Sequence, residues 1–67
     1  MKKEDLQRLK DTGNCPRGNV RGVDLGGASL LEAVLRETDL SQANLRGALL
    51  RRAILVQANL REANLQE

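Results

Sequence analysis

The hydrophobic positions of residues 18–67 repeat with a period of five. Divided into fives, this stretch reads GNVRG, VDLGG, ASLLE, AVLRE, TDLSQ, ANLRG, ALLRR, AILVQ, ANLRE and ANLQE. The central place holds Leu in nine consecutive fives, from Leu25 to Leu65, with Val20 before them. The first place is alanine in seven fives: Ala28, Ala33, Ala43, Ala48, Ala53, Ala58 and Ala63. This regularity predicts one repeated structural unit.

A period of five fits neither a straight α-helix nor a flat strand. On a helix, five residues advance by about 500°, so the leucines would wind around the axis without forming a stripe. On a flat strand, leucines five apart would alternate between the two faces. Within one five, however, the first and central places lie on the same side of an extended segment. If the chain turns by about a quarter circle after each five, both places always point inward, and about 20 residues close one coil of a stacked solenoid.

This pattern resembles that of the pentapeptide-repeat family, A-[DN]-L-x-x. The resemblance covers residues 18–67, and Gly13–Arg17 can be read as an irregular five before them. It implies an all-β fold, a right-handed quadrilateral parallel β-helix, in which the central Leu and the Ala two places before it form interior ladders. Some places depart from the family's usual residues: Gly18, Val20, Val23, Ser29, Val34, Thr38, Leu49 and Ile54.

Residues 2–12 do not follow the fives and predict a short helix. Leu6 and Leu9 are three apart, on one helical face. Gly13 suits the left-handed residue that ends many helices. About ten residues are too few for a stable helix in water, so the two leucines must pack against the first coil. We expect a cap on the solenoid, with a partner-binding arm as the alternative. The predicted organisation is a capping helix and connection at 1–13 and a β-helix of about 2.5 coils at 14–67.

Composition narrows the function. The chain of 67 residues has no aromatic residue and no His, and its net charge is +2, from eleven Lys and Arg against nine Asp and Glu. Base stacking and aromatic-cage binding are therefore excluded. The single Cys forms no internal disulfide and fits a reducing compartment. We find no signal peptide and no apolar run of about 18 residues, and therefore expect a cytoplasmic protein with no membrane segment.

Few residues could carry chemistry. Cys15 lies five before Val20, so its thiol should point inward as a small hydrophobic group, and without His it lacks the usual base of a reactive thiol. Asp24 and Asp39 are 15 apart and would lie on different sides of the coil, where Asx side chains support turns. We therefore predict no catalytic residue, no metal site, no cofactor and no enzymatic activity.

Apolar residues occupy places that normally face outward in two neighbouring sides of the coil. Such a cluster with polar surroundings is typical of an interaction site, although these side chains could also tuck into the corner and stiffen it. Both interpretations remain open. The predicted apolar patch consists of Leu31, Val34, Leu49, Ile54 and Val56.

The last coil, residues 48–67, offers a second surface. No residue of this chain lies above it, so we expect its upper edge to have unpaired backbone groups, which natural sheets usually cover or protect. Its interior layer includes Ala58, Leu60, Ala63 and Leu65. A two-fold contact between two such ends would be closed. We therefore predict a homodimer through this coil, with Leu60 and Leu65 near the axis.

The predicted function is a non-enzymatic structural and interaction module that binds a protein partner or itself and takes no small-molecule substrate. Some pentapeptide-repeat proteins inhibit DNA gyrase as DNA mimics, which is the alternative that the resemblance implies. A DNA mimic needs a strongly acidic surface, and this chain is slightly basic. Its arginines are spread over all sides among acidic residues, so nucleic-acid binding is not expected either.

Overall fold

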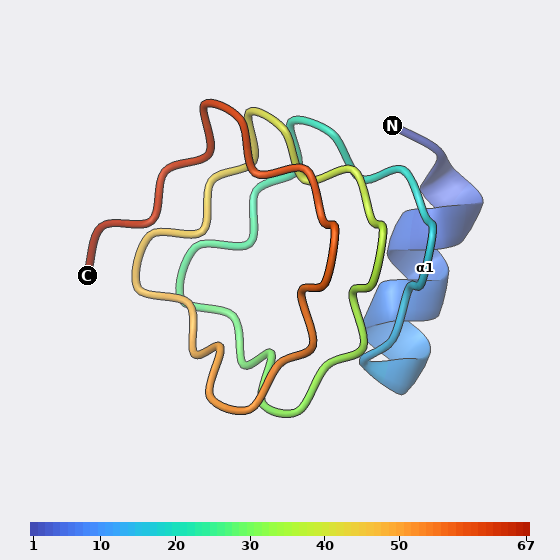
Figure 1. Cartoon of the computed structure of the whole chain (residues 1–67), viewed down its shortest axis with the longest axis horizontal. Helices are drawn as coiled ribbons and strands as arrows, with labels where there is room; N and C mark the ends of the chain where they lie inside the picture. The colour runs from blue at the N-terminus through green and yellow to red at the C-terminus, as the bar shows by residue number, and fades with distance from the viewer.

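The computed structural model describes residues 1–67 as one helix followed by a stack of coils (Figure 1). Helix α1 spans Lys3–Thr12. The remaining residues form no continuous strand. Instead, isolated parallel bridges join successive coils, and each joins residues 20 apart: Asn14 to Val34, Asn19 to Asp39, Asp24 to Asn44, Ser29 to Leu49, Val34 to Ile54, Asp39 to Asn59, and Asn44 to Asn64. The fold is therefore a β-helix with the 20-residue register that the period of five predicts.

A turn after each five explains why no longer strand forms. The first-place N–H donates to the carbonyl of the preceding central residue, as Ala33 does to Leu30 at 3.1 Å. The last place has a positive φ, for example 60° at Glu32 and 72° at Gly22. A positive φ at the third of four residues is the geometry of a type II turn. Extended backbone is thus limited to the few residues between turns, and the predicted all-β character takes the form of bridges.

Backbone hydrogen bonds run both ways between neighbouring coils. The N–H of Leu25 donates to the carbonyl of Asn44 at 2.8 Å, and the N–H of Asn44 donates back to the carbonyl of Val23 at 2.8 Å. The same pattern repeats in the other fives of the inner coils. In the irregular five that contains Cys15, the N–H of Cys15 donates to the carbonyl of Val34 at 2.9 Å, and the N–H of Val34 donates back to the side-chain Oδ1 of Asn14 at 2.9 Å. Each inner coil is therefore held on both of its edges.

The first and central places point inward and form the core. Leu25, Leu30, Leu35, Leu40 and Leu45 are all buried, as predicted. Full burial of one Leu contributes about 1.5–3 kcal/mol. The unusual first-place residue Thr38 is buried as well, and its hydroxyl donates to the carbonyl of Cys15 at 2.6 Å. Because that hydroxyl is paired, the polar group does not destabilise the interior.

Helix α1 covers the first coil, at the end opposite the C-terminus (Figure 1). Leu9 is buried and Leu6 packs against the core. Two hydrogen bonds join the helical segment to the coil edge: the N–H of Lys2 donates to the carbonyl of Asn19, and the N–H of Asn19 donates to Asp5 Oδ2, both at 2.9 Å. Gly13 ends the helix in the left-handed region, with φ 77°. The helix therefore replaces the missing coil below.

Adjacent residues test the inward assignment. Leu30 is 5% exposed and Leu31 is 51% exposed. We predict that Leu30→Asp abolishes cooperative folding, because it leaves an unpaired charge in the core. The same substitution at Leu31 should change the free energy of unfolding by less than about 0.5 kcal/mol. Circular dichroism with thermal melting compares them, and equal losses of stability would contradict the assignment.

Candidate interaction surfaces

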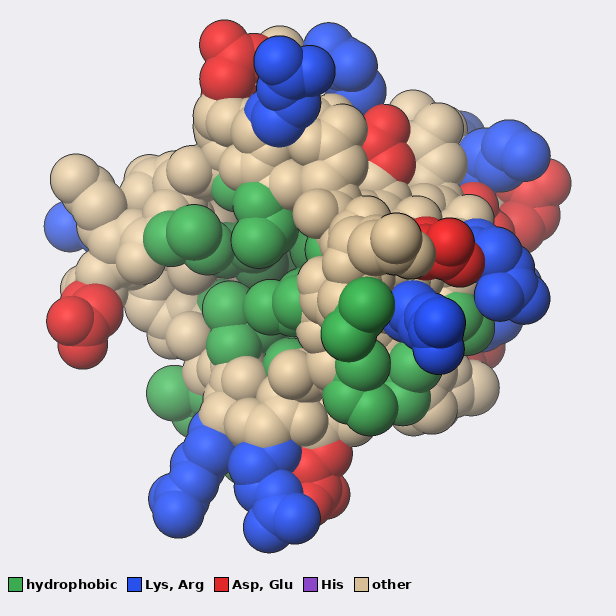
Figure 2. Space-filling view, in the orientation of Figure 1, with side chains coloured by type: hydrophobic (Ala, Val, Ile, Leu, Met, Phe, Trp, Pro, Cys, Tyr) green, Lys and Arg blue, Asp and Glu red, His purple; other side chains and the backbone are tan.

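The predicted apolar patch lies on the outside of two neighbouring sides of the coil. Val34 and Ile54 form a bridge, so their side chains stack on one side. Ile54, Val56, Leu49 and Leu31 are exposed, whereas Val34 is partly buried. Hydrophobic side chains gather in the middle of the face shown in Figure 2, and charged side chains project from its edge.

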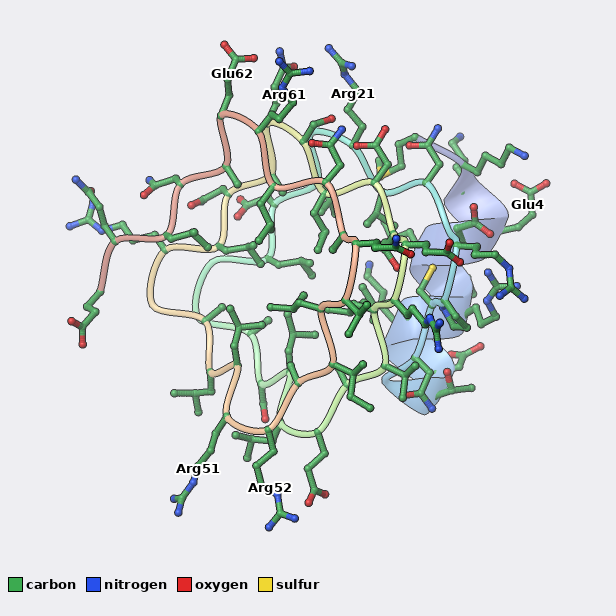
Figure 3. The ribbon with its side chains drawn as sticks, in the orientation of Figure 1. Glu4, Arg21, Arg51, Arg52, Arg61 and Glu62 are labelled. Atoms are coloured by element: carbon green, nitrogen blue, oxygen red, sulfur yellow. The ribbon has the colours of Figure 1, made fainter.

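The patch is not continuous along the chain. Arg51 and Arg52 project from the corner that separates Leu49 from Ile54 (Figure 3). Arg52 faces Glu32 of the coil below at 3.7 Å, a pairing that the 20-residue register predicts. The structure thus brings Val34 and Ile54 together, but it places a basic corner between Leu49 and Ile54. Sequence spacing alone did not predict this separation.

The last coil has an uncovered interior layer. Ala58, Leu60 and Ala63 are partly buried, and Leu65 is 52% exposed. No coil of this chain lies above this one, and the upward-pointing N–H groups of Leu50, Leu55 and Leu60 donate to no backbone carbonyl in this chain. The corresponding groups in the middle coil are all bonded. This coil therefore has a sheet edge with free donors and an apolar interior beside it.

Cys15 is buried, as its register with Val20 predicts. Its thiol lies 3.4 Å from the carbonyl oxygen of Asp5 and 3.8 Å from Arg8 Nη2. A Cβ built on Gly18 would lie 2.0 Å from this sulfur. The thiol thus occupies the space that an Ala side chain takes in other fives. This clash explains why the first place holds glycine here.

Second-place Asn and Asp side chains support the turns, as expected. Each accepts a hydrogen bond from the backbone N–H two residues later, at 3.0–3.2 Å. The six residues are Asn19, Asp24, Asp39, Asn44, Asn59 and Asn64. In the fives with Val34, Leu49 or Ile54 at this place, that side-chain bond is absent.

Asp39 is held more firmly than the other members of this set. Its Oδ1 accepts the Ser41 hydroxyl at 2.6 Å and the Ser41 N–H at 3.0 Å. These two hydrogen bonds, and the charge of Arg21, lower the pKa of the Asp39 carboxyl, while partial burial opposes the shift. A lowered pKa makes Asp39 a weak base, unsuited to general-base catalysis at neutral pH.

One hollow lies on the side formed by the fives 18–22, 38–42 and 58–62. Its volume is about 450 Å³, and it is open to solvent. The 20-residue register places three of its residues in one ladder, but the sequence pattern did not predict the hollow. The lining residues are Arg21, Ser41, Asn59, Arg61 and Glu62.

No group of three His, Cys, Asp or Glu side chains is arranged so that it could hold a metal ion. The single helix is neither long enough nor apolar enough to cross a bilayer.

Comparison with known proteins places the chain in a family. The family model "Pentapeptide repeats (8 copies)" matches residues 19–52 and 44–67. The chain belongs to the pentapeptide-repeat family. No curated protein gives a significant match.

Solved structures of the same family are similar. A pentapeptide-repeat protein from the Arabidopsis thaliana thylakoid lumen has a TM-score of 0.75 and 42% identity over 78% of this chain. The pentapeptide-repeat protein Rfr23 from the cyanobacterium Cyanothece 51142 has a TM-score of 0.74 and 33% identity over 76%. The match spans 36% and 35% of those two chains, about a third of each. These neighbours imply that the β-helix is right-handed.

The Asp39 geometry predicts a pH dependence. Because the folded pKa lies below the unfolded value, the carboxylate stabilises the fold above the unfolded pKa, and this stability is lost as pH falls through the folded pKa. We predict that Asp39→Asn lowers the free energy of unfolding at neutral pH and that its difference from wild type shrinks in acid. Urea titrations across pH measure this difference. Ser41→Ala should reduce the pH dependence, because it removes the largest cause of the shift; a difference independent of pH would contradict the assignment.

Proposed function

We propose that this chain is a right-handed quadrilateral solenoid that acts as a non-enzymatic structural and interaction module. It binds a protein partner or a second copy of itself through its outer faces and its last coil. The distribution of exposed large hydrophobic residues carries this proposal. Four of the six, Leu49, Ile54, Val56 and Leu65, lie within residues 48–67. Exposed apolar residues that cluster in one part of a small domain are typical of interaction sites.

The structure also offers little that would support catalysis. Leu and Ala side chains fill the interior, and the one hollow is lined by polar and charged residues on the outside. The Ser41 hydroxyl in that hollow donates to Asp39, whose lowered pKa disfavours proton abstraction. A nucleophile needs a base poised to accept its proton. These observations support a binding role for the surface.

Self-association through the last coil is the specific form of the proposal. Two such coils related by a two-fold axis across the solenoid would bring their upper edges together in an antiparallel sense. Each edge has free N–H groups, at Leu50, Leu55 and Leu60, and free carbonyls at the alanines between them. Antiparallel edges with both kinds of group can form a hydrogen-bonded ladder. The contact would also cover Leu65, whose side chain is the most exposed of the central leucines.

The symmetry of the contact and the small size of the domain favour a second copy of this chain as the partner of the last coil. A two-fold contact uses the same surface on both protomers and stops at the dimer, whereas a contact between unlike ends would continue into a filament. A domain of this length buries a limited core, and a dimer would join two cores across the shared layer. The buried free thiol of Cys15 is compatible with the reducing cytoplasm that we propose as its location.

We predict that Leu65→Lys converts a homodimer into a monomer of lower stability. The added charge would lie in the covered layer, and the cover itself would be lost. Sedimentation equilibrium at high micromolar concentration measures the mass, and thermal melting measures the stability. Leu31→Lys is the matched control, because Leu31 is equally exposed but lies outside the last coil.

Two results would contradict this proposal. One is a wild-type monomer at high micromolar concentration whose stability equals that of Leu65→Lys. The other is dissociation of the Leu31→Lys control to the same extent, because the contact would then involve a side of the solenoid and not its end.

A further inference from the structure

The hollow on the outside of the fives 18–22, 38–42 and 58–62 results from side chains of unequal length in one ladder. Arg21, Ser41 and Arg61 occupy the same place in successive coils, 20 residues apart. The short Ser41 side chain between two long arginines leaves a space of about 450 Å³. Arg21 and Arg61 both project outward from this side, and Glu62 lies beside Arg61 (Figure 3).

Hydrogen-bond acceptors around the hollow are largely engaged. Asn59 Oδ1 accepts the N–H of Arg61 at 3.1 Å, and Glu62 Oε1 accepts from Gln42 Nε2 at 3.2 Å. Asp39, just behind Ser41, accepts both the hydroxyl and the N–H of that residue. Each of the two acids nearest the hollow therefore has one carboxylate oxygen that accepts from neutral donors of the protein.

The donors around the hollow are free. No carboxylate lies within ion-pairing distance of Arg21 or Arg61, whereas Arg8, Arg17 and Arg52 each have one. The side-chain NH₂ group of Asn59 donates to no protein acceptor either. A site with free donors on several sides favours a ligand that supplies hydrogen-bond acceptors.

We infer that this hollow binds a phosphate-type oxyanion, free or as a monoester, between Arg21 and Arg61. Two coil spacings separate the arginines by about 10 Å along the solenoid axis. That gap admits one tetrahedral ion that accepts hydrogen bonds of about 2.8 Å from both guanidinium groups. Planar guanidinium forks suit this geometry, and Asn59 supplies a further donor on the wall.

Asp39 and Glu62 limit the affinity of the site for an anion. Asp39 and Glu62 together offset the charge of the two arginines, so binding depends on directed hydrogen bonds more than on net charge. Glu62 lines the hollow, and its carboxylate repels an anion there. Glu62→Gln should therefore tighten binding, whereas a loss of affinity in this variant would contradict the assignment of Glu62 as a repulsive group.

Titration with inorganic phosphate, followed by NMR of the arginine Nε–Hε groups, tests the inference. The signals of Arg21 and Arg61 should shift together along one saturating curve. Arg21→Gln and Arg61→Gln should each weaken binding by about tenfold, the effect of losing one hydrogen bond between charged groups. Arg46→Gln is the matched control. Arg46 is also the fourth residue of its five, 43–47, but its ladder neighbours 20 residues away are Gly26 and Gln66, so no second arginine lies beside it. Circular dichroism verifies that each variant is folded.

A short phosphoserine peptide forms the second arm of the experiment. Tighter binding of this peptide than of inorganic phosphate indicates a monoester ligand, and equal or weaker binding indicates the free ion. Equal loss of affinity in the Arg46→Gln control, or shifts without saturation, would overturn the site. The inference does not depend on self-association, so Leu65→Lys should bind phosphate as the wild type does.

Discussion

The turn that closes every five residues is the constraint on which the rest of the structure depends. It combines a hydrogen bond back to the preceding central residue with a left-handed last residue. Seven of these last residues are not glycine, although the left-handed conformation costs an L-residue about 1–2 kcal/mol. The hydrogen bonds and packing between coils offset that cost. With a turn after every five residues, the first and central places point inward on every side. This explains why the hydrophobic positions of the sequence repeat with a period of five.

The first and last coils of this chain differ in how their outer edges are paired. At the first coil, the backbone of Asn19 bonds to Lys2 and Asp5, and Leu9 covers the interior. At the last coil, the equivalent donors have no acceptor within the chain, and Leu65 is exposed. Interior packing leaves no room for a ligand, and the free backbone donors lie at the upper edge of the last coil. The proposed binding role therefore belongs to that edge and to the outer faces.

The main features of the fold could be predicted from the sequence because backbone geometry and hydrophobic period determine them. The inward leucines, the 20-residue register, the capping helix and the turn-supporting Asx residues all follow from local rules. Features that depend on side-chain volume across coils could not be predicted in this way. The thiol of Cys15 fills the space above Gly18, and the short Ser41 opens a hollow between two arginines. Likewise, the corner at Arg51 divides the apolar patch. This division could not be predicted, because the register alone does not give the direction of the side chains.

The central claim is that residues 20 apart stack directly, side by side, in neighbouring coils. Engineered disulfides test it in a Cys15→Ala background. Asn44 and Asn64 form a bridge, so cysteines at both positions should lie within the Cα separation of about 4.4–6.8 Å that a disulfide requires. We predict rapid oxidation of that pair within one chain and none for cysteines at positions 44 and 59, which lie on different sides of the coil. Equal oxidation of both pairs in the folded protein, or oxidation of the second pair alone, would contradict the register and the solenoid built on it.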